Sequence, residues 1–541
     1  MNEEGAHGLP RPTAWSLAGL VLLAALALAV GSARHDSVTS DEPAHIANGV
    51  IRLSERWPGF FREQPPLMNS LSALPLVLSG YRVPPGWKGR DHWEVGRHFL
   101  YMTGYDPYRM LFLARLPTIV LFVSLIALMY WFVLRQTGSA WWALTGAALT
   151  GFCPNLMAHG RLATVDLAMT FFCFAATVLL LSMIAKPSLP LAILFGLTSA
   201  AAVMSKVSGL ILAPYFVILI GGALAFRQIP DRRRFFQSLG IAIAVALVFF
   251  EALSLAETGT AFVAAEYPDT PRFLIPFAEY ASNIRTIRTW VDQGHAHPQF
   301  LLGEFSPDGW PHYYLVALLL KTPIPAILLF IGAAVATIRT RSFVLMALLM
   351  FIVLFVGVAA TSHLALGVRY VLPVYSFAYA ATAVALSSAG LRRTGIAIVG
   401  VLLTWHLVEN FRSYPSYISY FNQLIGSHRN ADRFLIDSNL DWGQDLRRLD
   451  QWARQEGIDE IIIHYFGGGA PGADLQMRVV GGYGAGGRPL PKGSWFALSR
   501  HFYRTSFNPS VSRENYDEYL ARSGARFVTT VGGSIDVYRV E

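Results

Sequence analysis

Long apolar runs, separated by short polar segments, alternate along the first 410 residues of the chain. A run of roughly 17 to 25 apolar residues is long enough to cross a bilayer as a helix. About eleven such runs occur, and they predict an α-helical polytopic membrane protein whose first helix is retained rather than cleaved. The runs cover residues 14–33, 109–134, 140–157, 164–185, 189–205, 208–226, 238–256, 313–337, 342–361, 370–388 and 394–410.

Positive residues gather in alternate gaps between these runs, as they do in cytoplasmic loops of membrane proteins. The other gaps, residues 34–108 and 257–312, are therefore predicted to be exoplasmic, together with everything after residue 410. Within the first gap, segment 66–80 is apolar but too short to span, so we expect a helix along the membrane surface. The positive residues are Arg135, Lys186, Arg227, Arg232, Arg233, Arg234, Arg339, Arg341, Arg392 and Arg393.

The tail, residues 411–541, lacks long apolar runs and is predicted to form a small soluble α/β domain after a membrane module of residues 1–410. We expect a helix over 441–456 and a strand over 460–465. The glycine-rich stretch 467–487 lacks the lysine and hydroxyl residues of a phosphate-binding loop, so we interpret it as a mobile loop.

Three acids in this tail, Asp437, Asp441 and Asp445, recur every four residues. On one helix they would share a face, which could hold a cation or a polar glycan. Acids near a helix start also stabilise the helix dipole, and Arg447 and Arg448 could neutralise them, so a purely structural role is favoured.

Composition agrees with a membrane protein, since 53% of the residues are apolar, 14% are charged and the mean hydropathy is +0.41. The net charge of +8 arises from short loops, which indicates topology and attraction to lipid phosphate rather than nucleic-acid binding. Both cysteines, Cys153 and Cys173, fall within apolar runs, so no disulfide framework is predicted. No repeat of solenoid period is present.

Two adjacent acids, Asp41 and Glu42, follow the first apolar run, within about 12 Å of the membrane surface if the intervening residues are helical. A helix cap with an acid in its first turn would explain both. A functional role is favoured by the density of charge around them, which exceeds what capping needs. The other ionisable residues of this loop are His45, Arg52, Arg56, Arg62 and Glu63.

Three later charged positions fall at turns assigned to the same exoplasmic face. Asp166 follows Arg161 where the third run passes into the fourth, Lys206 separates the fifth and sixth runs, and Arg369 opens the tenth. A helix cap with Arg161 as its surface partner would explain Asp166. Taken singly, Lys206 and Arg369 are explained as well by snorkelling to the membrane surface as by a functional role.

Lys321 differs because it lies about nine residues into its apolar run, ahead of Pro323 and Pro325. These prolines should kink or break the helix, and a buried cation at a kink is more often functional than structural. Glu251 could be its partner or a simple acid at the rim of its own helix.

Acids and cations far apart in sequence thus converge on one predicted membrane face. Such a set suits the transfer of a group from a lipid-linked phosphate to an outside acceptor. The cations would stabilise the phosphate leaving group, and a carboxylate would accept the proton of the attacking hydroxyl. A sugar carried on a polyprenyl phosphate would react in this way with inversion.

Several motifs together resemble the GT-C glycosyltransferases, in particular bacterial phospholipid-carrier-dependent enzymes related to protein O-mannosyltransferases and the lipid A aminoarabinose transferase. They cover most of the chain. The motifs are Asp41-Glu42-Pro43-Ala44-His45, the turn from His159 and Arg161 to Asp166, Ser205-Lys206-Val207-Ser208-Gly209-Leu210, Gly303 to Trp310 with Lys321-Thr322-Pro323, Arg369-Tyr370-Val371-Leu372-Pro373, and Asp437 to Leu446.

The resemblance implies a GT-C fold in a bacterial-type inner (plasma) membrane, an active site and C-terminal domain on the periplasmic side, and a polyprenyl-phosphate-linked hexose, such as mannose, as donor. Asp41 would be the base or an acid that binds the acceptor, Glu42 its neighbour in the acceptor site and Asp166 the second acid near the sugar. The phosphate would be bound by Arg161, Lys206, Arg369 and Lys321, and His45, His159 and Tyr370 would contact the acceptor or complete the site.

The acceptor hydroxyl could belong to a protein, a lipid or a glycan. Eukaryotic protein mannosyltransferases carry a different lumenal module before their last spans, whereas the soluble part is C-terminal here, which counts against a protein acceptor. Some GT-C members use a divalent metal, so Asp41 and Asp166 could instead bind magnesium or manganese.

Two other classes of protein remain. A multi-pass transporter of a lipid-linked or anionic substrate would place its charges near the midplane in repeated halves. A lipid-binding scaffold would keep the cations but would not need Asp41 or Asp166.

Overall fold

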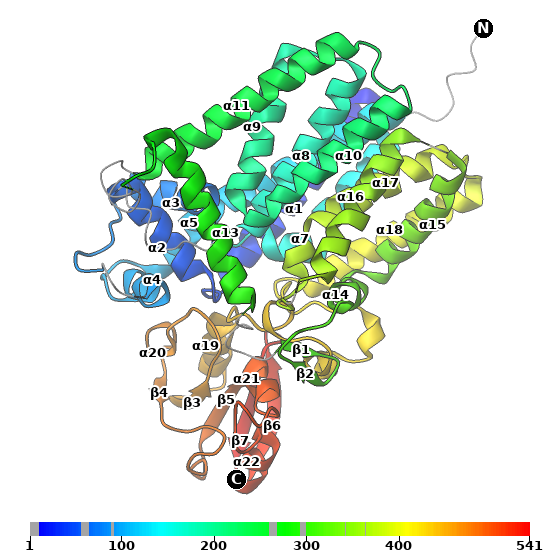
Figure 1. Cartoon of the computed structure of the whole chain (residues 1–541). Coiled ribbons are helices and arrows are strands. Elements are labelled where there is room, and N and C mark those ends of the chain that lie inside the picture. Colours follow the sequence, from blue (N-terminus) through cyan, green and yellow to red (C-terminus); the bar gives the residue numbers. More distant parts are fainter. Residues whose placement is uncertain are drawn as a thin grey trace.

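Long apolar helices form the greater part of the molecule, and a small sheet domain lies at one end of them (Figure 1). The computed structural model describes residues 10–55, 64–87, 91–258, 268–292, 299–340, 342–362 and 364–541. Arg56, Arg62, Glu63 and Arg341 lie outside these residues, so the predictions that involve them stay untested.

The N-terminal module is helical up to Ser413 apart from one short hairpin, β1 (Gln299–Leu301) with β2 (Glu304–Ser306). Its helices are α1 (Arg11–His35), α2 (Glu42–Glu55), α3 (Pro66–Leu78), α4 (His92–Tyr101), α5 (Pro107–Thr137), α6 (Ala140–Gly151), α7 (Pro154–His159), α8 (Asp166–Ala185), α9 (Leu189–Ser205), η1 (Val207–Ile211), α10 (Leu212–Ala225), α11 (Arg232–Thr258), η2 (Arg272–Leu274), α13 (Ile275–Asp292), α14 (Tyr313–Lys321), α15 (Ile324–Thr340), α16 (Phe343–Ala360), η3 (Val368–Val371), α17 (Pro373–Ser388) and α18 (Arg393–Ser413).

Within the described residues, seven helices are long and apolar enough to cross a membrane, and α14 with α15 would make an eighth. The chain is therefore a multi-pass membrane protein. The expected runs 140–157, 189–205 and 370–388 contain shorter helices: α6 has 12 residues, α9 has 17 and α17 has 16. The number of about eleven spans stays a prediction.

Prolines interrupt two of the expected spans. The helices α14 and α15 are bent by 114° at a break that contains Pro323, which confirms the expected kink. The run 140–157 is not one helix, because α6 ends at Gly151 and Pro154 starts α7. The interfacial segment forms α3, as predicted, although its position relative to a membrane is untested.

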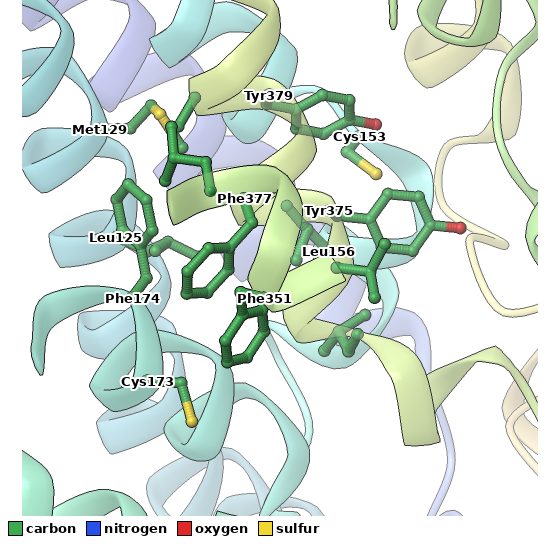
Figure 2. Packing of buried hydrophobic residues seen from close by; sticks show 14 of the residues in the cluster. Leu125, Met129, Cys153, Leu156, Cys173, Phe174, Phe351, Tyr375, Phe377 and Tyr379 are labelled. Carbon is green, nitrogen blue, oxygen red and sulfur yellow. The ribbon is translucent and has the colours of Figure 1, made fainter. Parts of the chain in front are cut away.

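Aromatic side chains from separate helices fill the core of the bundle (Figure 2). The ring of Phe377 on α17 stacks on Phe351 of α16, with centroids 3.7 Å apart, and its edge meets Phe174 of α8 at 5.5 Å. Cys153 and Cys173 are buried and free, in agreement with the absence of a predicted disulfide.

The C-terminal domain is a three-layer α/β unit built on a five-stranded sheet of order β4-β3-β5-β7-β6. Strands β4, β3 and β5 are parallel, and β7 pairs antiparallel with β5 and β6. The elements after α18 are η4 (Gln423–Ile425), η5 (His428–Arg433), η6 (Asp437–Asn439), α19 (Leu446–Gln455), β3 (Glu460–His464), α20 (Pro471–Asp474), β4 (Arg478–Val480), β5 (Trp495–Ser499), α21 (Arg500–Thr505), α22 (Tyr516–Ser523), β6 (Ala525–Val531) and β7 (Ile535–Val540).

Two expectations for the tail are wrong. Helix α19 begins at Leu446, not 441, because Asp437 and Gly443 adopt left-handed backbone angles, with φ of 57° and 91°, that end any helix before it. Asp437, Asp441 and Asp445 therefore do not share one helix face. The glycine-rich stretch is not a continuous loop either, since it contains α20 and the edge strand β4. The strand expected over 460–465 is confirmed as β3.

Candidate active site

Four of the predicted residues meet at one end of the bundle: Asp41, Asp166, Lys206 and Arg369. Arg369 Nη1 lies 2.8 Å from Asp41 Oδ2 and 3.6 Å from Asp166 Oδ2, and Lys206 Nζ lies 2.6 Å from Asp166 Oδ1. Each residue stands where a helix begins or ends: Asp41 precedes α2, Asp166 starts α8, Lys206 follows α9, and Arg369 lies in η3 ahead of α17. Their predicted convergence is confirmed as a contact network.

Aromatic faces hold the two cations of this network in place. The ammonium of Lys206 lies 4.0 Å from the ring centre of Tyr370, and the guanidinium of Arg369 lies 5.0 Å from the same ring. On its other side Arg369 lies 4.3 Å from the ring centre of Trp442, which comes from the C-terminal domain. Such cation–π contacts orient a cation without occupying its hydrogen-bond donors.

Burial and the neighbouring carboxylates shift the pKa values of Arg369 and Lys206 in opposite directions. Burial alone would lower the pKa of Arg369, but Asp41, Tyr370 and Asp166 raise it above its ordinary value. Burial lowers the pKa of Lys206 although Asp166 opposes this effect. Burial also lowers the pKa of His159 to about 3, so this imidazole is neutral and adds no charge beside Asp166. The network thus has two carboxylates and two cations.

Asp41 is the carboxylate of the network that another molecule can reach. Its side chain is 20% exposed, whereas those of Asp166 and Glu42 are fully buried. Asp41 is therefore placed to take a proton from a bound hydroxyl, while Asp166 is placed to hold Lys206 and Arg369.

Glu42 has a different environment from its neighbour Asp41. Its Oε1 and Oε2 accept hydrogen bonds at 2.7 Å each from Arg115 Nε and Nη2. Thr39 N and Oγ1 donate to Oε2, and Ala163 N donates to Oε1. Five donors thus surround a carboxylate that has no exposed surface. Glu42 thus ties the Asp41 loop to α5 and to the turn before Asp166, and its predicted place beside the acceptor stays a prediction.

Arg161 is likewise directed inward. Its Nη2 lies 2.6 Å from Asp36 Oδ2, its Nε donates to Ser32 Oγ at 2.6 Å, and its side chain is buried. The other oxygen of Asp36 lies 2.6 Å from Arg448 Nη2. These contacts conflict with the expected role of Arg161 as a phosphate ligand, because its guanidinium already binds Asp36 and Ser32 inside the protein.

Lys321 is also committed to structure. Its ammonium donates to the carbonyls of Ile418 at 2.8 Å and Asn439 at 2.5 Å and lies 4.4 Å from the ring centre of Phe421. Because all of these partners come from the segment after α18, Lys321 anchors that segment at the kink, contrary to its predicted role at the phosphate. Among the described residues, Glu251 forms no ion pair with Lys321.

The remaining predicted residues are His45, His159 and Tyr370, and each has different contacts. His45 Nδ1 lies 2.8 Å from Asn69 Oδ1 in the interior between α2 and α3. The ring of His159 meets that of Trp442 edge to face at 6.0 Å. Tyr370 lines a cavity beside Lys206 and is the best placed of the three to contact a ligand.

That cavity has a volume of 390 Å³ and is lined by residues of η1 and of the end of α16. Its apolar lining includes Leu210, Ile211, Phe355 and Val358, and its polar lining includes Lys206, Tyr370, Ser208 and Gln64. An apolar chamber with a cation at one end suits an amphiphile whose head group is anionic.

Several residues at the site are absent from the sequence-based candidates. Arg115, which binds Glu42, lies within an apolar run, and the cost of an unpaired charge there is a signal that could have identified it. Trp442 lies in the segment 441–456 that was expected to be helical, and Asp437 was a candidate only for an acidic helix face. Asp437 interacts electrostatically with Arg369, and burial raises its pKa.

The donor set does not fit a divalent metal ion. Among the described residues, no group of three or more His, Cys, Asp or Glu could hold one. The guanidinium of Arg369 occupies the position between Asp41 and Asp166 at which a bridging cation would have to bind. The positive charges available at this site are therefore those of Lys206 and Arg369.

Comparisons with known proteins give a family match over part of the chain. Residues 59–252, which include Asp166 and Lys206, match the sequence-family model described as dolichyl-phosphate-mannose-protein mannosyltransferase. A search of curated proteins finds no match.

Three solved structures are similar at low TM-scores. The apo oligosaccharyltransferase of Archaeoglobus fulgidus has a TM-score of 0.49 at 15% identity, over 76% of this chain and 56% of its own. ArnT from Cupriavidus metallidurans, bound to undecaprenyl phosphate, has a TM-score of 0.47 at 12% identity, over 97% and 98%. The S. cerevisiae protein O-mannosyltransferase Pmt1-Pmt2 complex, bound to the sugar donor, has a TM-score of 0.35 at 18% identity, over 45% and 34%.

The chain spans about half the length of the first of these structures and nearly all of the second. The family model thus matches 194 of the 541 residues, in the part of the chain that holds Asp166 and Lys206.

Proposed function

We propose that this protein transfers a hexose, such as mannose, from a polyprenyl-phosphate carrier to an acceptor hydroxyl at the exoplasmic face, with inversion at the anomeric carbon. The observation that carries the proposal is the position of the Asp41–Arg369–Asp166–Lys206 network beside an apolar cavity. The matching family, whose description names dolichyl-phosphate-mannose, supports the choice of a lipid-phosphate donor.

The cavity would hold the start of the lipid chain. Its walls of Ile211, Phe355 and Val358 face a hydrocarbon tail, and Lys206 and Tyr370 mark the polar end where the phosphate would sit. Arg369 lies beside both residues, so one phosphate can contact the ammonium and the guanidinium together.

In the transfer step, the acceptor oxygen forms a bond to the anomeric carbon as the bond from that carbon to the phosphate oxygen breaks. Asp41 accepts the hydroxyl proton, because it is the exposed carboxylate of the network. The departing polyprenyl phosphate gains one negative charge, which Lys206 and Arg369 stabilise. Asp166 touches neither reactant in this scheme and acts as a positioning residue for both cations.

A transporter would keep its charges near the midplane of the membrane. The four residues of the network stand instead at helix ends, next to a soluble domain. This arrangement favours chemistry at a membrane face.

The test is transfer by the full-length protein in nanodiscs, given radiolabelled polyprenyl-phosphate mannose and cell-envelope fractions. We expect label in an acceptor with wild type and with Asp459→Asn, whose side chain is exposed on the far side of the C-terminal domain. Asp41→Asn should abolish transfer and retain the fold. Equal transfer by Asp41→Asn would remove Asp41 as the base. If wild type fails with mannose, glucose and aminoarabinose donors alike, the glycosyltransferase proposal itself fails.

A further inference from the structure

A second cavity lies in the C-terminal domain, away from the charged network. It has a volume of 540 Å³, within the range of about 300 to 1,000 Å³ that small-molecule sites occupy. Four ring-bearing side chains line it: His464, Tyr483, Phe502 and Tyr516. The backbone of the glycine-rich segment 482–487 completes its wall. We call this cavity the glycine crevice.

The strand connections explain why a crevice forms here. After β3 the chain crosses to β4 on the α19 face of the sheet, where Leu475 and Met477 pack against Leu449. After β4 it crosses to β5 on the opposite face, where Leu490 packs near Tyr519. Two neighbouring parallel strands thus send their connections to opposite faces, and the carboxyl ends of such strands are where open α/β sheets bind ligands.

The rings are held in fixed orientations. Phe502 stacks on His464 with centroids 4.4 Å apart and planes 22° from parallel, and the Tyr516 hydroxyl hydrogen-bonds His464 Nδ1. Tyr483 is half-buried at the edge of the crevice. At Gly484 a Cβ atom would meet His464 and Tyr516 at 3.6 to 3.8 Å, so the absence of a side chain there keeps the space between these rings open.

The lining is neutral, which restricts the ligand. None of the described residues that line the crevice is Asp, Glu, Lys or Arg. Burial lowers the pKa of His464, so this imidazole carries no charge near pH 7. Arg488 lies beside Gly482 and Tyr483, and Glu514 accepts from Gly486 N, but neither side chain belongs to the lining. The hydroxyls of Thr505, Ser506 and Ser512 and the flat ring faces suit an uncharged, polar ring.

Contacts between rings connect the crevice to the candidate active site. Phe502 meets Phe466 at 5.9 Å, and Phe466 stacks on His501 at 3.8 Å. The backbone N–H of His501 donates to Asp441, the residue before Trp442, which in turn covers Arg369. These contacts link the crevice to Arg369 through neighbouring residues of the C-terminal domain.

We propose that the glycine crevice binds a neutral glycan and that this glycan is part of the acceptor. The assignment of this glycan to the acceptor rests on the proposed function, whereas glycan binding itself does not. The C-terminal domain would then select the acceptor by its sugar rings, while the network at Asp41 performs the transfer.

Saturation-transfer NMR on the full-length protein in nanodiscs tests the binding without any donor or turnover. The probes are mannotriose, maltotriose and chitotriose, with mannose 6-phosphate as the charged comparison. We expect saturation of the ring protons of at least one neutral trisaccharide and a weaker signal from the phosphate. Tyr483→Ala should weaken binding about tenfold, and Tyr483→Phe should retain it, because the ring face makes the contact.

Gly484→Leu should fill the crevice and abolish binding. Gly481→Leu is its matched control, since Gly481 belongs to the same loop, has open space around it and does not line the crevice. No signal from any neutral trisaccharide at millimolar concentration, or a signal that Gly484→Leu and Tyr483→Ala leave unchanged, would overturn the proposal. Binding without transfer would leave the crevice in place and count against the proposed function alone.

Discussion

The indole of Trp442 lies over the guanidinium of Arg369, 4.3 Å from ring centre to Cζ, so a residue of the soluble domain forms one wall of the candidate active site. The segment around Trp442 also contacts the loop that carries Asp41. Ser40 N donates to the Trp442 carbonyl and Ser37 N donates to the Gln444 carbonyl, each at 2.9 Å. The C-terminal domain thus positions Asp41 and Arg369 at the same time.

Trp442→Leu should lower the transfer rate about 30-fold, because a desolvated cation–π contact contributes about 2 kcal/mol to the orientation of the cation. Trp442→Phe should retain more activity than Trp442→Leu. The measurement is the initial rate at several donor concentrations, which separates kcat from KM. Trp495→Leu is the control, because Trp495 has a similar contact with Arg539 at 4.7 Å in the distal part of the sheet. Equal losses in Trp442→Leu and Trp495→Leu would indicate a general folding defect.

Lys206→Ala should weaken donor binding by about 10- to 100-fold, the range expected for one lost charge-assisted hydrogen bond to phosphate. Lys206→Arg should restore part of the affinity. Binding of polyprenyl-phosphate to each variant in nanodiscs gives the comparison, with Lys186→Ala as the control because Lys186 is exposed at the end of α8. Unchanged donor affinity in Lys206→Ala would remove Lys206 from the phosphate site.

Glu42→Gln should destabilise the fold by about 3 to 5 kcal/mol, the usual cost of breaking a buried ion pair, because it leaves the charge of Arg115 uncompensated. Asp41→Asn, one residue earlier, should change the melting temperature little because its side chain is partly exposed. Thermal unfolding of both variants in one detergent checks this contrast, and Glu456→Gln serves as an exposed control. A stable but inactive Glu42→Gln would instead return Glu42 to the list of catalytic groups.

The buried carboxyl of Asp441 should make stability depend on pH. Burial raises its pKa to about 7 in the folded protein, although Ser499, His501 N and Gly443 N donate to it. The unfolded chain releases this proton near pH 4 and the folded chain near pH 7, so stability due to this group falls as pH rises through that window.

Asp441→Asn removes this titration. The difference in melting temperature between wild type and Asp441→Asn should therefore change steadily from pH 5 to pH 7 and level off above pH 8, with wild type relatively more stable at the acidic end. A difference that is constant over this range would show that Asp441 does not titrate within it.

The contact network was predictable in part because charges are scarce and costly in an apolar chain. Asp41, Asp166, Lys206 and Arg369 all stand at run ends that the positive-inside pattern assigns to one face, and they do meet. The same reasoning cannot distinguish Asp41 from Glu42, or Lys206 from Arg161. Their roles depend on whether a partner such as Arg115 or Asp36 comes from a distant helix, and only tertiary structure decides that.

The tail shows a different limit. A spacing of four residues in Asp437, Asp441 and Asp445 indicates a helix, but the left-handed backbone at Asp437 and Gly443 sends the three carboxylates to different partners. Asp441 accepts from Ser499, Asp445 pairs with Arg448, and Asp437 lies near Arg369. The loop conformation at Asp437 and Gly443 therefore prevents the helix that the four-residue spacing predicts. This loop lies where the C-terminal domain contacts the candidate active site.

The meeting of Asp41, Asp166, Lys206 and Arg369 also constrains how the chain is threaded through the bilayer. Residues that touch at one membrane face must be separated by an even number of crossings. Between Asp41 and Asp166 the long helix α5 crosses once, so α6, with only 12 residues, has to bring the chain back. The same requirement for an even number of crossings means that α9 must return the chain from α8 to Lys206. It also means that α17 must cross, because Trp442, which follows α18, contacts Arg369. If any one of these three short helices did not cross, residues that are in contact would be assigned to opposite sides of the membrane.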